Sequence, residues 1–206
     1  RPASNLSLTN FRTYARNRGA KWNVLPYEQY KSVWYLYMVE YANTSVQIPV
    51  SAPDPTGLKT GGLGNGVTDA ISAEWSNFSN YNPFIPCGAS ITPGIGNFSG
   101  EKSYTVTNFG GVGANRSFKV LSYRGIENVF GHIWKHTDGV LVEVKTDADG
   151  GTSKLYTQSD PAMFADVITN YTYRGNLART GGYIKKLLFG TNGDILPTQV
   201  GGGSTT

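Results

Sequence analysis

The two histidines are the first residues of this chain whose type and spacing could support chemistry. His132 and His136 lie four residues apart, and on a helix that spacing would bring both imidazoles to one metal ion. The segment around them predicts a strand instead, in which both side chains point to one face but lie about 13 Å apart at ~3.3 Å per residue. We therefore predict no metal site there and expect ordinary half-buried or surface histidines.

The other reactive groups also lack the neighbours that catalysis requires. Cys87 is the only cysteine, which excludes an internal disulfide and a zinc site of several thiolates, and its Pro-Cys-Gly setting predicts a buried thiol. Glu127 and Asp138 could be the paired carboxylates of a glycan-degrading enzyme, but their context favours salt-bridge or turn roles. Asp147 and Asp149 lack the downstream glutamate of a calcium loop, so a polar hairpin turn is predicted. We expect no cofactor and no enzymatic activity.

The composition indicates one loop-rich domain over residues 1–206. The chain is 39% hydrophobic and 13% aromatic with 26 glycines, which provides a sizeable core, and no linker divides it. The net charge is +4, but the 18 Lys and Arg are scattered and Lys185-Lys186 is the only tight cluster, so nucleic-acid binding is not predicted. No apolar run approaches the ~20 residues that span a bilayer, so we expect no membrane insertion.

Two helices are predicted near the beginning of the chain. The first is capped by Thr9, runs to Arg18 and ends at Gly19; its expected amphipathic spacing comes from Phe11, Tyr14, Ala15 and Arg18. The second runs from Pro26 to about Asn43 and is expected to be the buried centre of the domain. Its wide apolar stripe consists of Tyr30, Val33, Trp34, Tyr37, Met38 and Tyr41, and Leu36 and Val39 extend that stripe almost all round.

The remainder is predicted to be a long irregular insertion followed by short antiparallel strands. Residues 44–100 are dominated by Gly, Pro, Asn and Ser without helix or strand periodicity, so they form a candidate contact surface. The predicted strands are 103–107, 117–123, 132–137, 140–145, 155–157 and 183–189. We expect Val140, Val142 and Val144 to form a packed face. Phe130 and Trp134 are expected core anchors, with glycines at the bends.

Several segments carry a family resemblance. Leu25-Pro26-Tyr27-Glu28-Gln29-Tyr30 and Gly131-His132-Ile133-Trp134-Lys135-His136 resemble the C-type lectin fold in its formylglycine-generating-enzyme-like branch. Four further segments are similar to phage and prophage structural proteins of gut bacteria that carry this fold: residues 14–19, 37–42, 122–128 and 182–190. The resemblance implies an α+β, C-type-lectin-like domain with two N-terminal helices packed on short antiparallel strands.

The resemblance also implies a non-enzymatic role in a virion, as a tail-fibre, baseplate or head-decoration domain. We expect the protein in the extracellular particle, in contact with other virion subunits as a homo-oligomer, and used in host attachment or particle assembly. The partner on the host is a surface glycan or a protein. A purely structural cement protein without a host ligand is the alternative, and the chain is compatible with a fragment of a longer protein.

The expected ligand-binding residues lie in two places. The first place is the irregular segment at residues 44–100. The second is the stretch just before residues 131–136, the segment that contains Trp134. Each aromatic side chain could instead pin the long loop to the core. The candidate residues are Trp75, Phe78, Tyr81 and Phe84 in the first place, and Arg124, Glu127 and Asn128 in the second.

Overall fold

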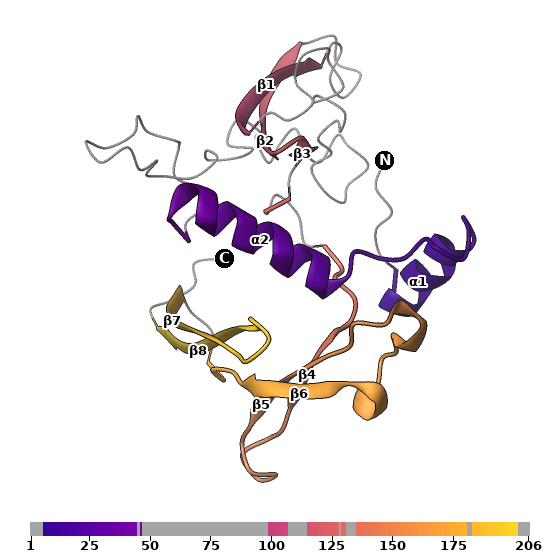
Figure 1. The fold of residues 1–206 in the computed structure, drawn as a ribbon, viewed down its shortest axis with the longest axis vertical. Coiled ribbons are helices and arrows are strands. Elements are labelled where there is room, and N and C mark those ends of the chain that lie inside the picture. The colour runs from indigo at the N-terminus through magenta and orange to yellow at the C-terminus, as the bar shows by residue number, and fades with distance from the viewer. Residues whose placement is uncertain are drawn as a thin grey trace. The chain divides into compact units, whose positions relative to one another are not determined.

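The computed structural model describes residues 6–44, 46, 99–106, 115–127, 129–130, 135–180 and 183–201. These residues form two α-helices and short antiparallel strands (Figure 1), which confirms the predicted α+β class. The chain divides into two compact units. Unit 1 contains residues 1–3 and 35–134, and unit 2 contains residues 4–34 and 135–206. Whether they form a single domain, as the composition predicts, stays a prediction.

The described part of unit 1 contains a three-stranded antiparallel sheet. Its strands are β1 (Gly100–Val106), β2 (Arg116–Tyr123) and β3 (Ile126–Glu127), in the order β1-β2-β3. A two-residue turn joins β2 to β3, and both of its residues, Arg124 and Gly125, have positive φ (49° and 81°). Left-handed conformations at both central positions match the right-handed twist of the flanking strands. The two predicted strands in this region are thus confirmed.

Four buried aromatic side chains pack together in the described part of unit 1, and we call them the aromatic cluster: Tyr37, Tyr41, Tyr123 and Phe130. The ring centroid of Tyr37 lies 4.8 Å from that of Tyr41, 5.7 Å from that of Tyr123 and 5.2 Å from that of Phe130. All four side chains are buried. Burial, followed by the neighbouring Tyr41 and Tyr123, raises the pKa of Tyr37 to about 12. Phe130 is therefore a core residue as predicted, whereas Trp134 lies outside the described residues.

Unit 2 contains a second three-stranded antiparallel sheet, in the order β4-β5-β6 (orange in Figure 1). Its strands are β4 (Val140–Val144), β5 (Ser153–Thr157) and β6 (Thr172–Asn176). A turn at residues 147–150 joins β4 to β5, so the predicted polar hairpin turn is confirmed. Two short 3-10 helices, η3 (Pro161–Met163) and η4 (Ile168–Asn170), precede β6. Strands β7 (Tyr183–Phe189) and β8 (Ile195–Gly201) form a separate antiparallel pair.

Helix α1 (Leu8–Arg16) exists as predicted, but its cap and its buried face differ from the prediction. The N-cap is Ser7, whose hydroxyl accepts from the Asn10 backbone N–H at 3.2 Å. Thr9, the predicted cap, donates its hydroxyl to Asp166 instead. The buried side chain of α1 is Arg12, whereas Tyr14 is exposed. A buried ion pair thus replaces the expected apolar contact.

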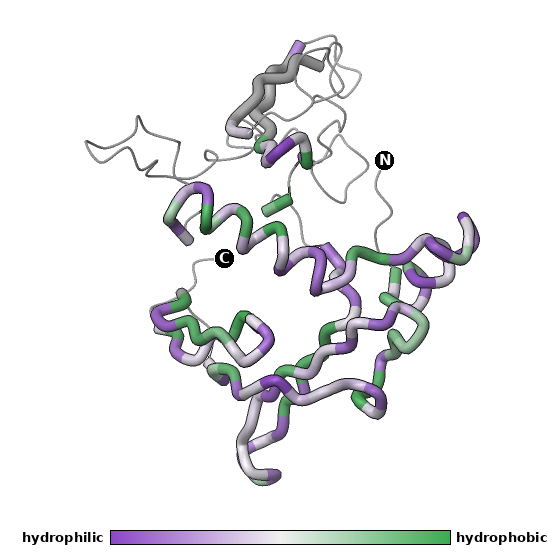
Figure 2. Tube along the Cα trace, viewed as in Figure 1, coloured by the Kyte–Doolittle hydropathy of each residue, from purple (hydrophilic) through white to green (hydrophobic). Residues whose placement is uncertain are grey.

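Helix α2 (Tyr27–Tyr41) matches the predicted second helix closely. Tyr37 and Tyr41 are buried, as the apolar stripe predicts. Leu36 is exposed and Val39 is 84% exposed, so the expectation that apolar contacts continue almost all round the helix is wrong. Hydrophobic and hydrophilic segments both occur along the helix in Figure 2, and only part of its surface is covered.

Two strand predictions are also corrected. Val142 and Val144 are exposed, while Leu155 on β5, which pairs with Val142, is buried. In the described sheet β4 lies at the edge with one neighbouring strand, so its valines are only partly covered. Residues 135–137 are not a strand, although a strand was predicted over 132–137, whose first three residues lie outside the described ranges. Asp138 instead makes an isolated bridge to Pro26.

Candidate functional site

Five of the seven predicted ligand-binding residues lie outside the described residues. These are Trp75, Phe78, Tyr81, Phe84 and Asn128. His132 and Cys87 lie outside them as well. The predictions made for these residues stay predictions, and a candidate site has to be built from the rest of the chain.

The two predicted residues that are described, Arg124 and Glu127, lie on the β2–β3 hairpin. Arg124 is at the exposed tip, where its Nε is 3.0 Å from Glu40 Oε2 and its backbone N–H donates to Ser99 Oγ at 2.8 Å. The hydrogen bond to Glu40 is the main cause of a raised pKa of Arg124. Glu127 pairs with Ser122 in the strand register and is half-buried. Arg124 therefore forms an ion pair with Glu40 next to Tyr123, which is a member of the aromatic cluster.

Asp138, one of the two carboxylates considered for catalysis, belongs to a buried ion cluster in unit 2. Arg12 holds it with two parallel bonds, Nε to Oδ2 at 2.6 Å and Nη2 to Oδ1 at 2.9 Å. The same guanidinium donates from Nη1 to Asp166 Oδ1 at 2.6 Å and from Nη2 to the Ala165 carbonyl at 3.3 Å. Asp166 also accepts from the Thr9 hydroxyl. We call these residues the Arg12 cluster; it attaches α1 to the chain before β4.

The electrostatics of the Arg12 cluster fit a structural role. The hydrogen bond to Asp138 is the main cause of a raised pKa of Arg12. The Thr9 hydroxyl, followed by Arg12, lowers the pKa of Asp166 below its ordinary range. The Asp166 carboxylate is thus stabilised as an anion, and the bidentate pairing of Arg12 with Asp138 is geometrically specific. The predicted salt-bridge role of Asp138 is confirmed.

A second buried ion cluster, the Lys31 cluster, joins α2 to β6 and to the β7–β8 connection. Lys31 Nζ lies 2.7 Å from Glu28 Oε2 and 3.2 Å from Asp194 Oδ1, and it donates to the Asn192 carbonyl at 3.1 Å. Arg174 Nε lies 3.5 Å from the other oxygen of Asp194. Burial alone would lower the pKa of Lys31, but the hydrogen bonds to Glu28 and Asp194 outweigh it and the pKa is raised.

The described residues also bear on metal binding and membrane insertion. Within them, no group of three or more His, Cys, Asp or Glu side chains is arranged to hold a metal ion. His136 is exposed, and its ring centroid lies 4.8 Å from that of Phe11. None of the helices in the described ranges combines the length and apolar character that crossing a bilayer requires.

One face of the β4–β5–β6 sheet carries polar and aromatic side chains from all three strands. We call it the polar-aromatic face, and it consists of Glu143, Lys154, Tyr156, Tyr173 and Asn176. The strand register places these residues together: Lys154 is opposite both Glu143 and Asn176, and Tyr156 is opposite Tyr173. Side chains of residues opposite each other in neighbouring strands point to the same side of the sheet.

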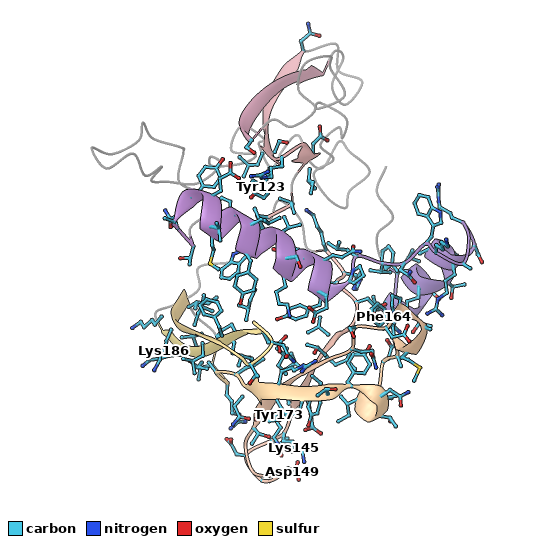
Figure 3. The ribbon with its side chains drawn as sticks, in the orientation of Figure 1. Tyr123, Lys145, Asp149, Phe164, Tyr173 and Lys186 are labelled. Carbon is cyan, nitrogen blue, oxygen red and sulfur yellow. The ribbon has the colours of Figure 1, made fainter. Side chains whose placement is uncertain are left out.

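Contacts across the polar-aromatic face fix its two tyrosine rings. The Tyr156 and Tyr173 centroids are 5.7 Å apart at an interplanar angle of 61°, an edge-to-face arrangement. The Tyr156 hydroxyl donates to Glu143 Oε2 at 3.3 Å, and the Tyr173 hydroxyl donates to Asn176 Oδ1 at 3.0 Å. Lys154 Nζ lies 6.0 Å from the Tyr173 ring centroid. Tyr173 lies on β6, and Lys145 and Asp149 are labelled below it toward the end of the β4–β5 hairpin (Figure 3).

The two sides of this sheet differ in burial. Along β5, Ser153, Leu155 and Thr157 are buried, whereas Lys154 and Tyr156 between them are half-buried. Tyr173 is 49% exposed. Partial burial, followed by the negative charge of Glu143, raises the pKa of Tyr156, so the phenol remains a neutral hydrogen-bonding group at physiological pH. The face can offer apolar ring surface together with donors and acceptors.

The sequence prediction missed this face because it missed strand β6. Residues 172–176 are short and contain Gly175, which has φ +157° and lies where a Cβ would come 2.7 Å from Leu196. Glycine within a strand weakens the local signal. Thr172 and Tyr173, which are residue types that favour strands, are the local signal that could have indicated β6.

Strand β7 exposes a second kind of surface. Its side chains Ile184, Leu188 and Phe189 are all exposed, and the Phe189 ring centroid is 6.2 Å from that of Trp34. Within the described residues, β7 has β8 as its neighbour in a two-stranded sheet. Exposed apolar side chains on an edge strand are typical of association between chains.

No protein-family model, curated protein or solved structure matches this chain. The described residues offer three features that bear on function: the two buried ion clusters, the polar-aromatic face and the apolar side chains of β7.

Proposed function

We propose that this chain is a non-enzymatic phage virion protein that acts in host attachment or particle assembly. The observation that carries the proposal is the polar-aromatic face, because exposed tyrosines beside hydrogen-bonding groups are typical of recognition surfaces. The resemblance of the segments at residues 14–19, 37–42, 122–128 and 182–190 to phage structural proteins supports the virion assignment. The C-type-lectin-like fold is part of the same proposal, and two helices followed by short antiparallel strands support it.

The roles of the buried ionisable groups also support binding rather than catalysis. Arg12 holds Asp138 and Asp166, and Lys31 holds Glu28 and Asp194. A general acid or base needs a group that can exchange a proton with a substrate near neutral pH. These carboxylates are instead paired with Arg12 and Lys31, so we expect them to stabilise contacts between segments of the chain.

A purely structural cement role is the second candidate, and strand β7 favours it. Ile184, Leu188 and Phe189 are exposed on one strand, and burying them against a neighbouring subunit would remove apolar area from water. A homo-oligomer or a mixed assembly of virion subunits could provide that cover. In this alternative the protein has no ligand on the host.

Purified particles test the proposed function. Phage particles from bacteria that carry the gene would be analysed by mass spectrometry and by electron microscopy with gold-labelled antibody against this chain. We expect the chain in the particles at stoichiometric amounts, with label at exposed tips for attachment or between subunits for cementing. Absence of the chain from intact particles would overturn the virion assignment.

A further inference from the structure

We infer that the polar-aromatic face is a saccharide-binding site that takes a neutral sugar ring against Tyr173. This ligand class deepens the proposed function and rests on it, because it names what an attachment protein would bind. The site is distinct from the ligand-binding residues that the sequence predicts, and it lies wholly within the β4–β5–β6 sheet of unit 2.

The chemistry of the face matches the two kinds of surface on a sugar. A pyranose has an apolar side of C–H groups and a rim of hydroxyls, so it suits an aromatic ring bordered by hydrogen-bonding groups. Tyr173 provides an exposed ring on β6, with Asn176 and Lys154 beside it. Glu143 and the Tyr156 hydroxyl, which donates its proton to Glu143, add acceptor oxygens at the same face.

The face is also organised before a ligand arrives. Tyr173 is fixed by its hydroxyl bond to Asn176 at 3.0 Å and by the edge-to-face contact with Tyr156. All five side chains come from paired strands, which hold their positions better than a loop does. A ring already held in its binding orientation loses little conformational freedom on association, which favours affinity from a small contact area.

Charge balance points to a neutral ligand. Glu143 and Lys154 are opposite each other in the strand register, so one negative and one positive charge face the site together. Tracking a phosphate backbone requires several cations on one surface, and this face has one. A stable protein partner usually needs about 800 Å² from each side, which is much more than two tyrosines and three polar side chains present.

The test uses immobilised neutral oligosaccharides. The purified full chain would be applied to an array of glucan, mannan, galactan and chitin fragments, and the binding constant for each positive fragment would be measured by calorimetry. Three variants accompany the wild type: Tyr173→Ala, Tyr173→Phe and the control Tyr14→Ala. Tyr14 suits the control because its exposure, 54%, is close to the 49% of Tyr173, and it lies on α1 in the same unit.

The expected result is binding of at least one neutral fragment by the wild type. Tyr173→Ala should weaken that binding roughly tenfold or more, whereas Tyr173→Phe, which keeps the ring, should lose only a small factor, and Tyr14→Ala should bind like the wild type. Thermal unfolding of each variant checks that the fold is kept.

Two results would overturn the inference: an array without any bound neutral fragment, or equal binding by Tyr173→Ala and the wild type. In each case the virion assignment is judged separately, from the presence of the chain in purified particles, so the two failures are distinguishable.

Discussion

The cores of the two units are stabilised by different chemistry. In unit 1 the aromatic cluster packs tyrosine and phenylalanine rings 4.8–6.3 Å apart between centroids. In unit 2 the most buried contacts include two ion clusters, in which Arg12 and Lys31 hold carboxylates at 2.6–3.2 Å. The apolar burial of rings is non-directional and ring pairs accept several angles, whereas a buried ion pair requires defined geometry.

This difference predicts how each unit responds to change. Replacing a buried ring by a smaller side chain removes its contacts with the neighbouring rings. A buried ion pair that loses one member leaves an uncompensated charge away from water, which costs more than the pair contributed. We therefore expect the ion clusters to be the more sensitive points and to give unit 2 its dependence on pH.

The largest expected effect comes from Asp138→Ala. This change leaves the buried Arg12 guanidinium without its bidentate partner, and removing one member of a buried pair costs about 3–5 kcal/mol. Urea unfolding measures the loss of free energy. Asp147→Ala is the matched control, because it removes an exposed pair with Arg179 in the same unit. Equal effects of the two changes would contradict the role assigned to the Arg12 cluster.

Replacing Tyr37 by Leu should have the next largest effect. Tyr37 is fully buried and has three ring neighbours in the aromatic cluster, so losing the ring should cost about 2 kcal/mol. The same unfolding measurement checks it, with the exposed Tyr14→Leu as the control. If the loss exceeds that of Asp138→Ala, rings and not ion pairs are the more sensitive contacts.

The third prediction concerns acid. The pKa of Asp166 is lowered by Thr9 and Arg12 below its ordinary 3.8, so its stabilising contribution is present above that value and is lost as pH falls through the lower, folded-state pKa. Asp166 is largely exposed, so the loss should be under about 1 kcal/mol. Unfolding curves measured at intervals of ~0.5 pH unit between about pH 5 and about pH 2 should show this loss of free energy of unfolding.

Asp166→Asn is the control for this acid dependence. The amide does not titrate, so the variant should lack the part of the decline that belongs to Asp166. An unchanged acid profile in Asp166→Asn would show that the decline comes from other carboxylates.

The smallest effect is expected from Arg124→Asn in unit 1. Arg124 has φ +49° at the first position of a two-residue turn before Gly125, where asparagine is favoured. The variant gains turn preference and loses an exposed ion pair with Glu40, so its melting temperature should stay close to that of the wild type. Arg124→Val, which is unsuited to positive φ, should melt lower.

Some elements could be predicted from the sequence because their signals are local. The apolar spacing and preceding proline of α2, the Phe, Val and Tyr residues of β2 and the Asp- and Gly-rich turn at 147–150 are each signals from neighbours along the chain. Strands β6 and β8 were missed because β6 contains Gly175 and β8 contains Pro197, and both residues weaken a strand signal.

The candidate site required tertiary information. Glu143, Lys154 and Tyr173 come from three strands, and nothing in their sequence spacing shows that strand pairing places them on one face. Similarly, nothing in the spacing of α1 indicates that Arg12 is buried, and its burial depends on pairing with Asp138, far along the chain.

The amino-acid sequence alone determined the α+β class, the position of α2 and several strands, since these follow from side-chain periodicity and turn residues. Only the tertiary structure decided which charges are buried and which tyrosines remain exposed. The physical reason is that burial of a charge or a ring depends on partners from distant segments, and a linear pattern does not specify them.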